Sequence, residues 1–267
     1  MNDLMFLEIQ DFSREQIKSV FNRVDSHGIV EQKLPIACSF EGRGIRTKTS
    51  FYQAVHCIGL DYIELPVLLD TDERLQDVAG YLDEIHSAYI IRYSNHERLR
   101  EFAKSSKRPV INAMSSEEHP CEAMSDVFWF QSVKPVGDSC VLIWGPMTNV
   151  LRSWAALFQC LGGNVIHFRP TQSTLSNSVV ERRDFSKLEI DIVVTDGWPK
   201  KFSDPACRLT IEDLESLGHP RFLPTPPFTI GKELGFDPVL YSGFCGYKQK
   251  RSLVPVQAAI LHYLIEG

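Results

Sequence analysis

Side chains suited to anion binding gather in one short stretch of the chain, residues 39–59, which reads SFEGRGIRTKTSFYQAVHCIG. Arg46, Thr47 and Lys48 follow Gly44 where an amphipathic pattern begins, at the expected start of a helix. Such a start offers backbone N–H groups and the positive end of the helix dipole, which together bind phosphate. The same residue types also occur at solvated helix starts, so both interpretations stay open for this stretch alone.

Further polar residues follow buried runs elsewhere in the chain. Arg92 ends the apolar run 88–91, His119 precedes a helical pattern, and Asn149 opens another. Asp196 comes after the expected strand 190–194. In parallel α/β sheets, ligands bind outside the carboxyl ends of the strands. We therefore expect these side chains to line a binding site.

The elements that must position these residues alternate along the chain. Strands are expected at 34–40, 88–91, 109–112, 139–144, 165–168 and 190–194. Helical spacing is present near 13–24, 50–58, 75–85, 97–104, 122–133, 149–161 and 256–265. The alternation predicts an α/β protein with two doubly wound parallel-sheet domains and a C-terminal helix that packs back. The expected boundary divides a domain at 1–133 from a domain at 134–267, which includes the C-terminal helix.

Composition narrows the class of protein. The chain has 267 residues, of which 43% are hydrophobic and 23% are charged, and it contains no apolar run long enough to span a bilayer. The N-terminus lacks the pattern of a secretory signal, so we expect a cytoplasmic protein with no membrane partner. A net charge of −6 argues against a nucleic-acid partner. Seven cysteines without a C-x-x-C pair are expected to be mostly reduced and buried.

Several of these segments, in order, resemble motifs of the aspartate/ornithine carbamoyltransferase family. In the first half, the family's S-T-R-T-R-x-S-F is similar to G-I-R-T-K-T-S-F at 44–51, a strand-end arginine matches Arg92, and H-P-x-Q matches H-P-C-E at 119–122. In the second half, G-D-x-x-N-N-V, D-x-W and L-P of the ornithine branch are similar to 145–150, 196–198 and 223–224.

The resemblance implies transfer of a carbamoyl group from carbamoyl phosphate to an amine, without a cofactor or a metal. It implies that the phosphate is held by Gly44, Ile45, Arg46 and Thr47. The implied catalytic residues at the carbonyl oxygen are Thr47, Arg92 and His119. The implied contacts of the carbamoyl group are Glu122 and Leu223, and those of the amine are Asn149 and Asp196. The family's sites lie at subunit boundaries in trimers, so a homotrimer is expected.

Each of these residues also has a structural interpretation. Arg92 could form a salt bridge with Glu117 or Glu118, and His119 could be a loop histidine before proline. Asn149 could be a helix N-cap, and Asp196 a turn residue.

Departures from the family motifs affect residues that the resemblance assigns to both substrates. Gly44 and Ile45 replace a hydroxyl pair, which removes hydrogen bonds to phosphate worth on the order of a kcal/mol each. Glu122 replaces a glutamine that accepts from the carbamoyl NH2; a carboxylate can still accept, favour a more cationic donor, or pair with Arg92.

On the amine side, the lysine that the aspartate branch carries in a loop is missing from 69–73. Pro199-Lys200-Lys201 and Arg221-Phe222 also replace residues of the ornithine branch. The sequence therefore favours a carbamoyltransferase for an ornithine-like amine rather than aspartate. The alternatives are a non-catalytic member that binds a ligand or partner, and transfer from another acyl phosphate.

Overall fold

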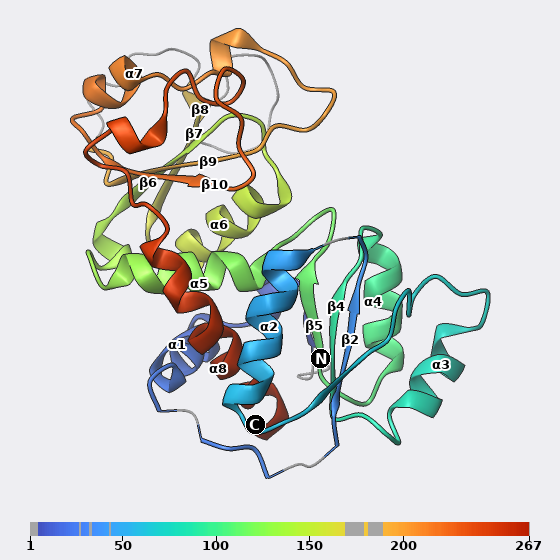
Figure 1. Cartoon of the computed structure of the whole chain (residues 1–267). Coiled ribbons are helices and arrows are strands. Elements are labelled where there is room, and N and C mark those ends of the chain that lie inside the picture. Colours follow the sequence, from blue (N-terminus) through green and yellow to red (C-terminus); the bar gives the residue numbers. More distant parts are fainter. Residues whose placement is uncertain are drawn as a thin grey trace. The chain divides into compact units, whose positions relative to one another are not determined.

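The computed structural model describes residues 5–26, 28–31, 34–42, 44–168, 179–180 and 189–266. The chain separates into two compact units (Figure 1). Unit 1 comprises the chain up to Phe128 together with the segment from Lys250 onward, and unit 2 comprises Trp129–Gln249. This division into units does not test whether a boundary after residue 133 separates two domains that bind different ligands. That boundary therefore stays a prediction.

Unit 1 contains a five-stranded sheet in which all paired strands are parallel. In spatial order its strands are β1 (Met5–Phe6), β5 (Val110–Met114), β4 (Ala88–Arg92), β2 (Ile36–Phe40) and β3 (Tyr62–Glu64). Every residue of β2 is buried, as expected for a strand covered on both faces. The carboxyl ends of β2 and β4 adjoin, since Phe40 is in register with Arg92.

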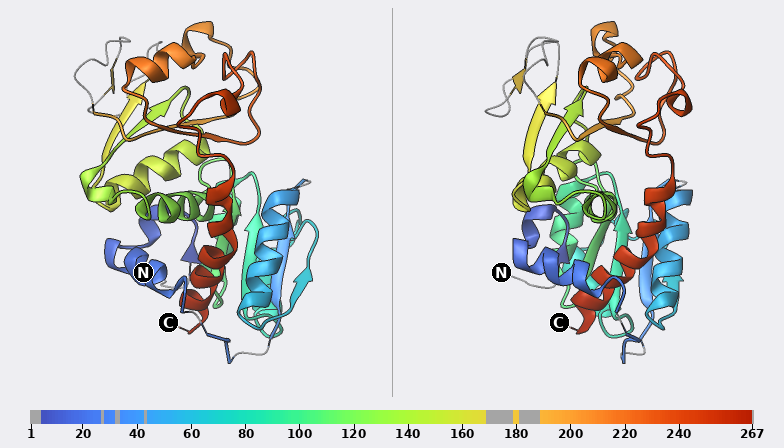
Figure 2. Two further views of the ribbon diagram at one scale, coloured as in Figure 1. Left: turned by 60° about the vertical axis from the view of Figure 1, so that its left-hand side comes forward. Right: turned by 90° about the vertical axis from the view of Figure 1, so that its left-hand side faces the viewer.

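Helices cover both faces of this sheet. They are α1 (Arg14–Arg23), α2 (Ile45–Cys57), α3 (Leu75–Leu82), α4 (His96–Ser105), α5 (Pro120–Gln131) and α8 (Leu253–Glu266). α8 packs against α1 and α2, as both views in Figure 2 show. α3 and α4 pack together, and their apolar side chains form one core with sheet residues such as Tyr89 and Ile91. The C-terminal helix therefore packs back onto the first half of the chain, as expected.

Unit 2 repeats the parallel arrangement. Its strands in spatial order are β10 (Arg221–Thr225), β9 (Ile192–Asp196), β6 (Cys140–Trp144), β7 (Asn164–Phe168) and β8 (Val179–Val180). α6 (Asn149–Cys160) packs on β6, β7 and β9. Trp144, Phe168 and Phe222 contribute to a core with α7 (Ile211–Ser216) and the segment around Phe236.

Neither β10 nor α7 was expected from the sequence. Pro224 lies inside β10, and proline argues against a central strand because it lacks the N–H that the ladder needs. β10 is the edge strand of its sheet, where proline is tolerated. α7 spans only six residues, so its periodicity is short. Thr210 and Asp213 form a capping box at its start, and this pattern is recognisable in the sequence.

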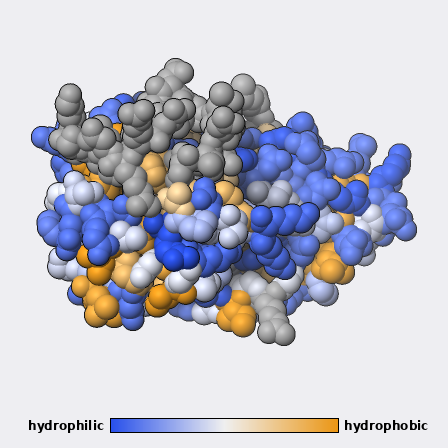
Figure 3. Space-filling model, turned by 90° about the horizontal axis from the view of Figure 1, so that it is seen from above, coloured by the Kyte–Doolittle hydropathy of each residue, from blue (hydrophilic) through white to orange (hydrophobic). Residues whose placement is uncertain are grey.

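Among the described helices, none is long and apolar enough to cross a membrane. On the face shown in Figure 3, hydrophobic residues form small groups among hydrophilic ones. All seven cysteines lie in the described part of the chain and none forms a disulfide; Cys38, Cys121 and Cys207 are buried, whereas Cys57 is exposed.

Candidate active site

The loop after β2 approaches the end of β4 at Gly44. This glycine precedes α2 with a left-handed backbone (φ 38°), and a Cβ placed there would lie 3.4 Å from Cδ of Arg92. The Gly44 carbonyl accepts the N–H of Lys48 at 2.9 Å, so the helix begins at once. The first turn therefore carries Arg46 and Thr47, and its leading N–H groups lack intrahelical acceptors.

Arg92 ends β4 at an irregularity of the sheet. Ile91 pairs with Asn112 of β5 and Arg92 with Met114, so one extra residue of β5 is accommodated there. Such bulges redirect side chains at the ends of strands. The half-buried Arg92 donates from Nη1 to Oγ1 of Thr47 at 3.3 Å, which joins two of the expected catalytic residues.

Two arginines, Arg46 and Arg92, lie near each other at this helix start, and the carboxylate of Glu41 acts on Arg92 only from beyond salt-bridge distance. Among the described residues, neither Arg46 nor Arg92 lies within 4.0 Å of a carboxylate oxygen, so the interpretation of Arg92 as a salt bridge to Glu117 or Glu118 is wrong. Burial and then the nearby positive charge of Arg46 lower the pKa of Arg92. A bound anion would relieve that repulsion.

His119 stands directly before α5, with Pro120 in the first helical position. The loop before it is fixed by Asn112, whose amide donates to the carbonyl of Leu7 at 2.8 Å and that of Glu118 at 3.3 Å. The His119 side chain is buried, and burial lowers its pKa to about 4, with Arg92 acting in the same direction. The imidazole is therefore neutral near pH 7 and can donate a hydrogen bond without carrying charge.

Glu122 does not pair with Arg92, which corrects one of its expected interactions. Lys250 donates from Nζ to Oε1 of Glu122, and also to Oδ1 and Oδ2 of Asp126 at 2.9 and 3.1 Å. Burial raises the pKa of Glu122, but Lys250 and His119 both lower it and together outweigh burial, so the pKa of Glu122 is lowered. Sequence reasoning missed Lys250, which is 128 residues from Glu122 and lies in no motif.

The polar residues of unit 2 gather around the ends of β6 and β9. Gly145 follows β6 with a φ of 105°, and a Cβ there would approach Nε1 of Trp198 to 3.2 Å. Thr148 caps α6 by accepting the N–H of Leu151 at 3.3 Å, and its hydroxyl donates to Oδ2 of Asp196 at 2.7 Å. The glycine loop and the D-x-W segment thus form one cluster.

Thr148, not Asn149, is the N-cap of α6, which corrects the structural interpretation of Asn149. Asn149 is the first residue of the helix and half-buried, and its Oδ1 accepts the N–H of Val150 at 3.0 Å. Asp196 is the last residue of β9 rather than a turn residue.

Leu223 lies in the middle of β10, in register with Val194, and its side chain is fully buried. Glu122 belongs to unit 1 and Leu223 to unit 2, so their joint contact with a carbamoyl group stays a prediction.

Glu233 is a further buried carboxylate that the sequence did not single out. Its Oε1 accepts the N–H of Trp198 and its Oε2 that of Thr229, both at 2.8 Å. Gly197 lies so close to the main chain of Pro227 that a Cβ would come within 2.4 Å of its carbonyl oxygen. Glu233 thus holds the segment after Asp196 in place.

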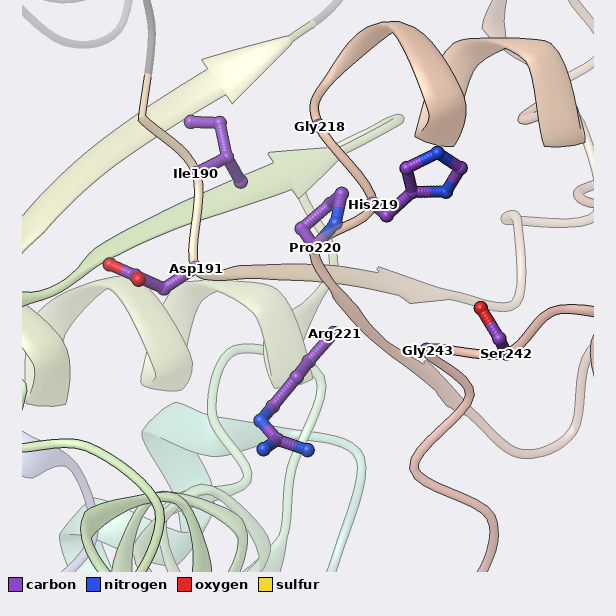
Figure 4. Close-up of a pocket in the computed structure, with 8 residues that line it drawn as sticks. All are labelled: Ile190, Asp191, Gly218, His219, Pro220, Arg221, Ser242 and Gly243. Carbon is purple, nitrogen blue, oxygen red and sulfur yellow. The ribbon is translucent and has the colours of Figure 1, made fainter.

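A hollow in unit 2 lies at the amino-terminal ends of β9 and β10 (Figure 4). It is lined by Ile190, Asp191, Gly218, His219, Pro220, Arg221, Ser242 and Gly243. Asp191 is engaged by Lys134 at 2.7 Å, and the side chains of His219 and Arg221 point away from each other in Figure 4. No convergent set of polar groups forms there among the described residues.

Comparison with known proteins identifies the class. Residues 5–132 match the family model for the carbamoyl-phosphate-binding domain of aspartate/ornithine carbamoyltransferases. An ornithine carbamoyltransferase of Methanopyrus kandleri is 30% identical, with 72% of this chain and 71% of that protein covered. One of Burkholderia lata is 23% identical, with coverage of 98% and 96%.

Solved structures agree in fold. Ornithine carbamoyltransferase from Thermus thermophilus superposes with a TM-score of 0.88 at 20% identity, covering 98% of both chains. The enzyme from Pyrococcus furiosus gives a TM-score of 0.86 at 20% identity, covering 98% of this chain and 97% of that one. The chain belongs to the aspartate/ornithine carbamoyltransferase family.

Proposed function

We propose that this protein transfers the carbamoyl group of carbamoyl phosphate to the amine of an ornithine-like amino acid or small amine. The observation that carries this proposal is the pair of guanidinium groups, Arg46 and Arg92, that converge without a carboxylate partner in the described residues beside a buried, neutral His119. The similar proteins named above are ornithine carbamoyltransferases, which supports an ornithine-like acceptor.

On the donor side, the first turn of α2 and the Arg46 guanidinium would hold the phosphate. Thr47, Arg92 and His119 would donate to the carbonyl oxygen as negative charge develops on it. The unprotonated amine attacks the carbonyl carbon, the bond from that carbon to the phosphate oxygen breaks, and inorganic phosphate leaves and takes up the proton that the amine loses. Residues 1–133 would form this donor domain, and the family match over 5–132 supports that assignment.

On the acceptor side, Asn149 and Asp196 would bind the amino acid, with the carboxylate of Asp196 facing its cationic groups. Thr148 already donates to one oxygen of Asp196, which orients the carboxylate. Residues 134–267 would supply this side of the site. Aspartate is disfavoured because the segment 69–73 carries no lysine. By resemblance, we expect a homotrimer, which sedimentation equilibrium would test.

The alternative is a non-catalytic member that binds a ligand or a partner subunit. The observation that favours it is the altered phosphate loop, where Gly44 offers no side-chain donor and the side chain of Ile45 is 69% exposed. Loss of hydroxyl donors weakens phosphate binding, although the backbone donors remain.

Calorimetric titration of carbamoyl phosphate into the purified protein tests the proposal, followed by a panel of amines scored by product mass. Arg46→Ala should weaken carbamoyl phosphate binding about a hundredfold because charge-assisted hydrogen bonds are lost. Lys48→Ala is the matched control in the same turn, since Lys48 pairs with Glu64 at 3.2 Å. Absence of product with every amine would support the non-catalytic alternative.

A further inference from the structure

Lys250 enters the donor side of the site from a distant part of the chain. It lies in the 3-10 helix Lys248–Ser252 that leads into α8, and it contacts Glu122 and Asp126, which are one turn apart on α5. The side chains are largely buried, with exposed fractions of 20% for Lys250, 16% for Glu122 and 0% for Asp126. These contacts form a compact cluster of one cation and two anions.

The geometry leaves one oxygen of Glu122 available. The Lys250 ammonium has three N–H donors, and its contacts are Oε1 of Glu122 and both oxygens of Asp126. Oε2 of Glu122 accepts no hydrogen bond from a described residue. Lys250 thereby holds the carboxyl group by one oxygen and leaves the other to accept from a ligand.

The charges near Glu122 place this oxygen at the donor side of the site. Lys250, His119 and Arg46 all act on the Glu122 carboxylate, and Lys250 is the largest of the three. Two carboxylates against one ammonium leave the cluster with a net negative charge. An oxygen in that setting binds N–H groups strongly and repels groups that can only accept.

We infer that Lys250 is a positioning residue that keeps Glu122 ionised and oriented as an acceptor for the amide N–H of the transferred group. The cluster thereby selects acyl phosphates that carry N–H on the acyl carbon over those that carry a methyl group. This inference rests on the proposed function, because it assumes that the phosphate lies at the start of α2.

The test compares dissociation constants of carbamoyl phosphate and acetyl phosphate by calorimetry. In Glu122→Gln, the Lys250–Asp126 pair remains, so the fold is retained. We expect carbamoyl phosphate to bind about fivefold more weakly, since a neutral acceptor replaces a charged one, and acetyl phosphate to bind as well or better. The preference for carbamoyl phosphate should therefore fall.

Lys250→Met should lower the same preference and make it depend on pH. Without the ammonium, the pKa of Glu122 rises, so the acceptor form is lost near neutral pH and returns as the pH increases. The charged or titratable groups around Glu122 are Lys250, Asp126, His119 and Arg46, and the lowered pKa of His119 keeps its imidazole neutral between pH 6.5 and 8. The wild-type preference should be constant over that range. Lys250→Arg should restore it in part, and Lys248→Met, at an exposed lysine of the same segment, should leave it unchanged.

The outcomes separate the two proposals. A wild-type protein that does not bind carbamoyl phosphate overturns both, whereas one that binds carbamoyl phosphate no more tightly than acetyl phosphate overturns the selection by Glu122 and Lys250. A wild-type preference that stays within twofold in Glu122→Gln and Lys250→Met overturns the role of Lys250 and leaves the carbamoyltransferase proposal standing. If Lys250→Met does not fold, Glu122→Gln and Lys250→Arg still decide, because both keep a cation beside Asp126.

Discussion

The clusters of unit 1 and unit 2 use polar groups in different ways. In unit 1, Arg46 and Arg92 meet without a carboxylate within 4.0 Å among the described residues, so their charge is available for a ligand. In unit 2, Thr148 donates to Asp196 and Glu233 accepts from the main chain of Trp198. Polar groups there are satisfied largely within the protein.

Under the proposed function, this difference matches the groups that the two halves would recognise. A phosphate needs concentrated positive charge, and the residues that supply it match the family motif, apart from the hydroxyl pair. An amine is recognised by shape and by a few acceptors, which can change with the substrate. The departures at Pro199 and Arg221 fall in unit 2, where a change of acceptor would be accommodated.

The sharpest test of the donor half is His119→Asn, which keeps a donor of smaller reach. The turnover number should fall about 10²-fold to 10³-fold, because a preorganised donor to the developing oxyanion is lost. The Michaelis constant for the amine should change little, as measured by steady-state kinetics. A control variant replaces the side-chain amide of exposed Asn95, which caps α4. An equal loss of turnover number in that variant would contradict the role of His119.

The pH dependence of stability follows from the buried imidazole of His119. Its pKa is lowered to about 4 from an ordinary 6.5, so the unfolded chain binds the proton more tightly than the folded protein. Stability conferred by neutral His119 is present above pH 6.5 and falls by roughly 3 kcal/mol as the pH drops toward 4. Urea unfolding of wild type and His119→Asn between pH 4 and 8 checks this, and parallel curves would refute it.

Gly145→Ala tests whether the glycine loop of unit 2 depends on close packing. A residue with Cβ is strained at a φ of 105° and meets Trp198, so unfolding free energy should drop by about 1–3 kcal/mol. Gly137→Ala is the matched control, because its nearest neighbour is 4.0 Å away and its φ is not positive. Equal melting temperatures of the two variants would show that the approach to Trp198 is relaxed in solution.

Asp196→Asn should have the smallest of these effects, and it should change only the binding of the amine substrate. Asparagine can still accept from Thr148, so the cluster is retained while the negative charge is removed. The Michaelis constant of the amine should rise about tenfold, and the affinity for carbamoyl phosphate should not change. Asp237→Asn, at an exposed helix cap, is the control. A weaker carbamoyl phosphate affinity in Asp196→Asn would contradict the division between the two halves.

Much of the architecture follows from local sequence patterns. The capping box of Ser13 and Gln16 begins α1, and the expected strands 34–40 and 88–91 correspond to the neighbouring strands β2 and β4. These features depend on residues close in the chain, so periodicity and capping signals are sufficient to predict them. Arg46, Thr47, Arg92 and His119 were likewise recognisable because each follows or opens such an element.

Other features depend on contacts between distant residues, for which the chain carries no local signal. The strand β10 holds a proline that only an edge position tolerates, and edge or centre is decided by the assembled sheet. The partner of Glu122 is Lys250 rather than Arg92, because α8 returns against α2 and carries the preceding segment to α5. Residue types and their order along the chain thus indicate the class of chemistry, whereas the pairing of buried charges is decided only by tertiary packing.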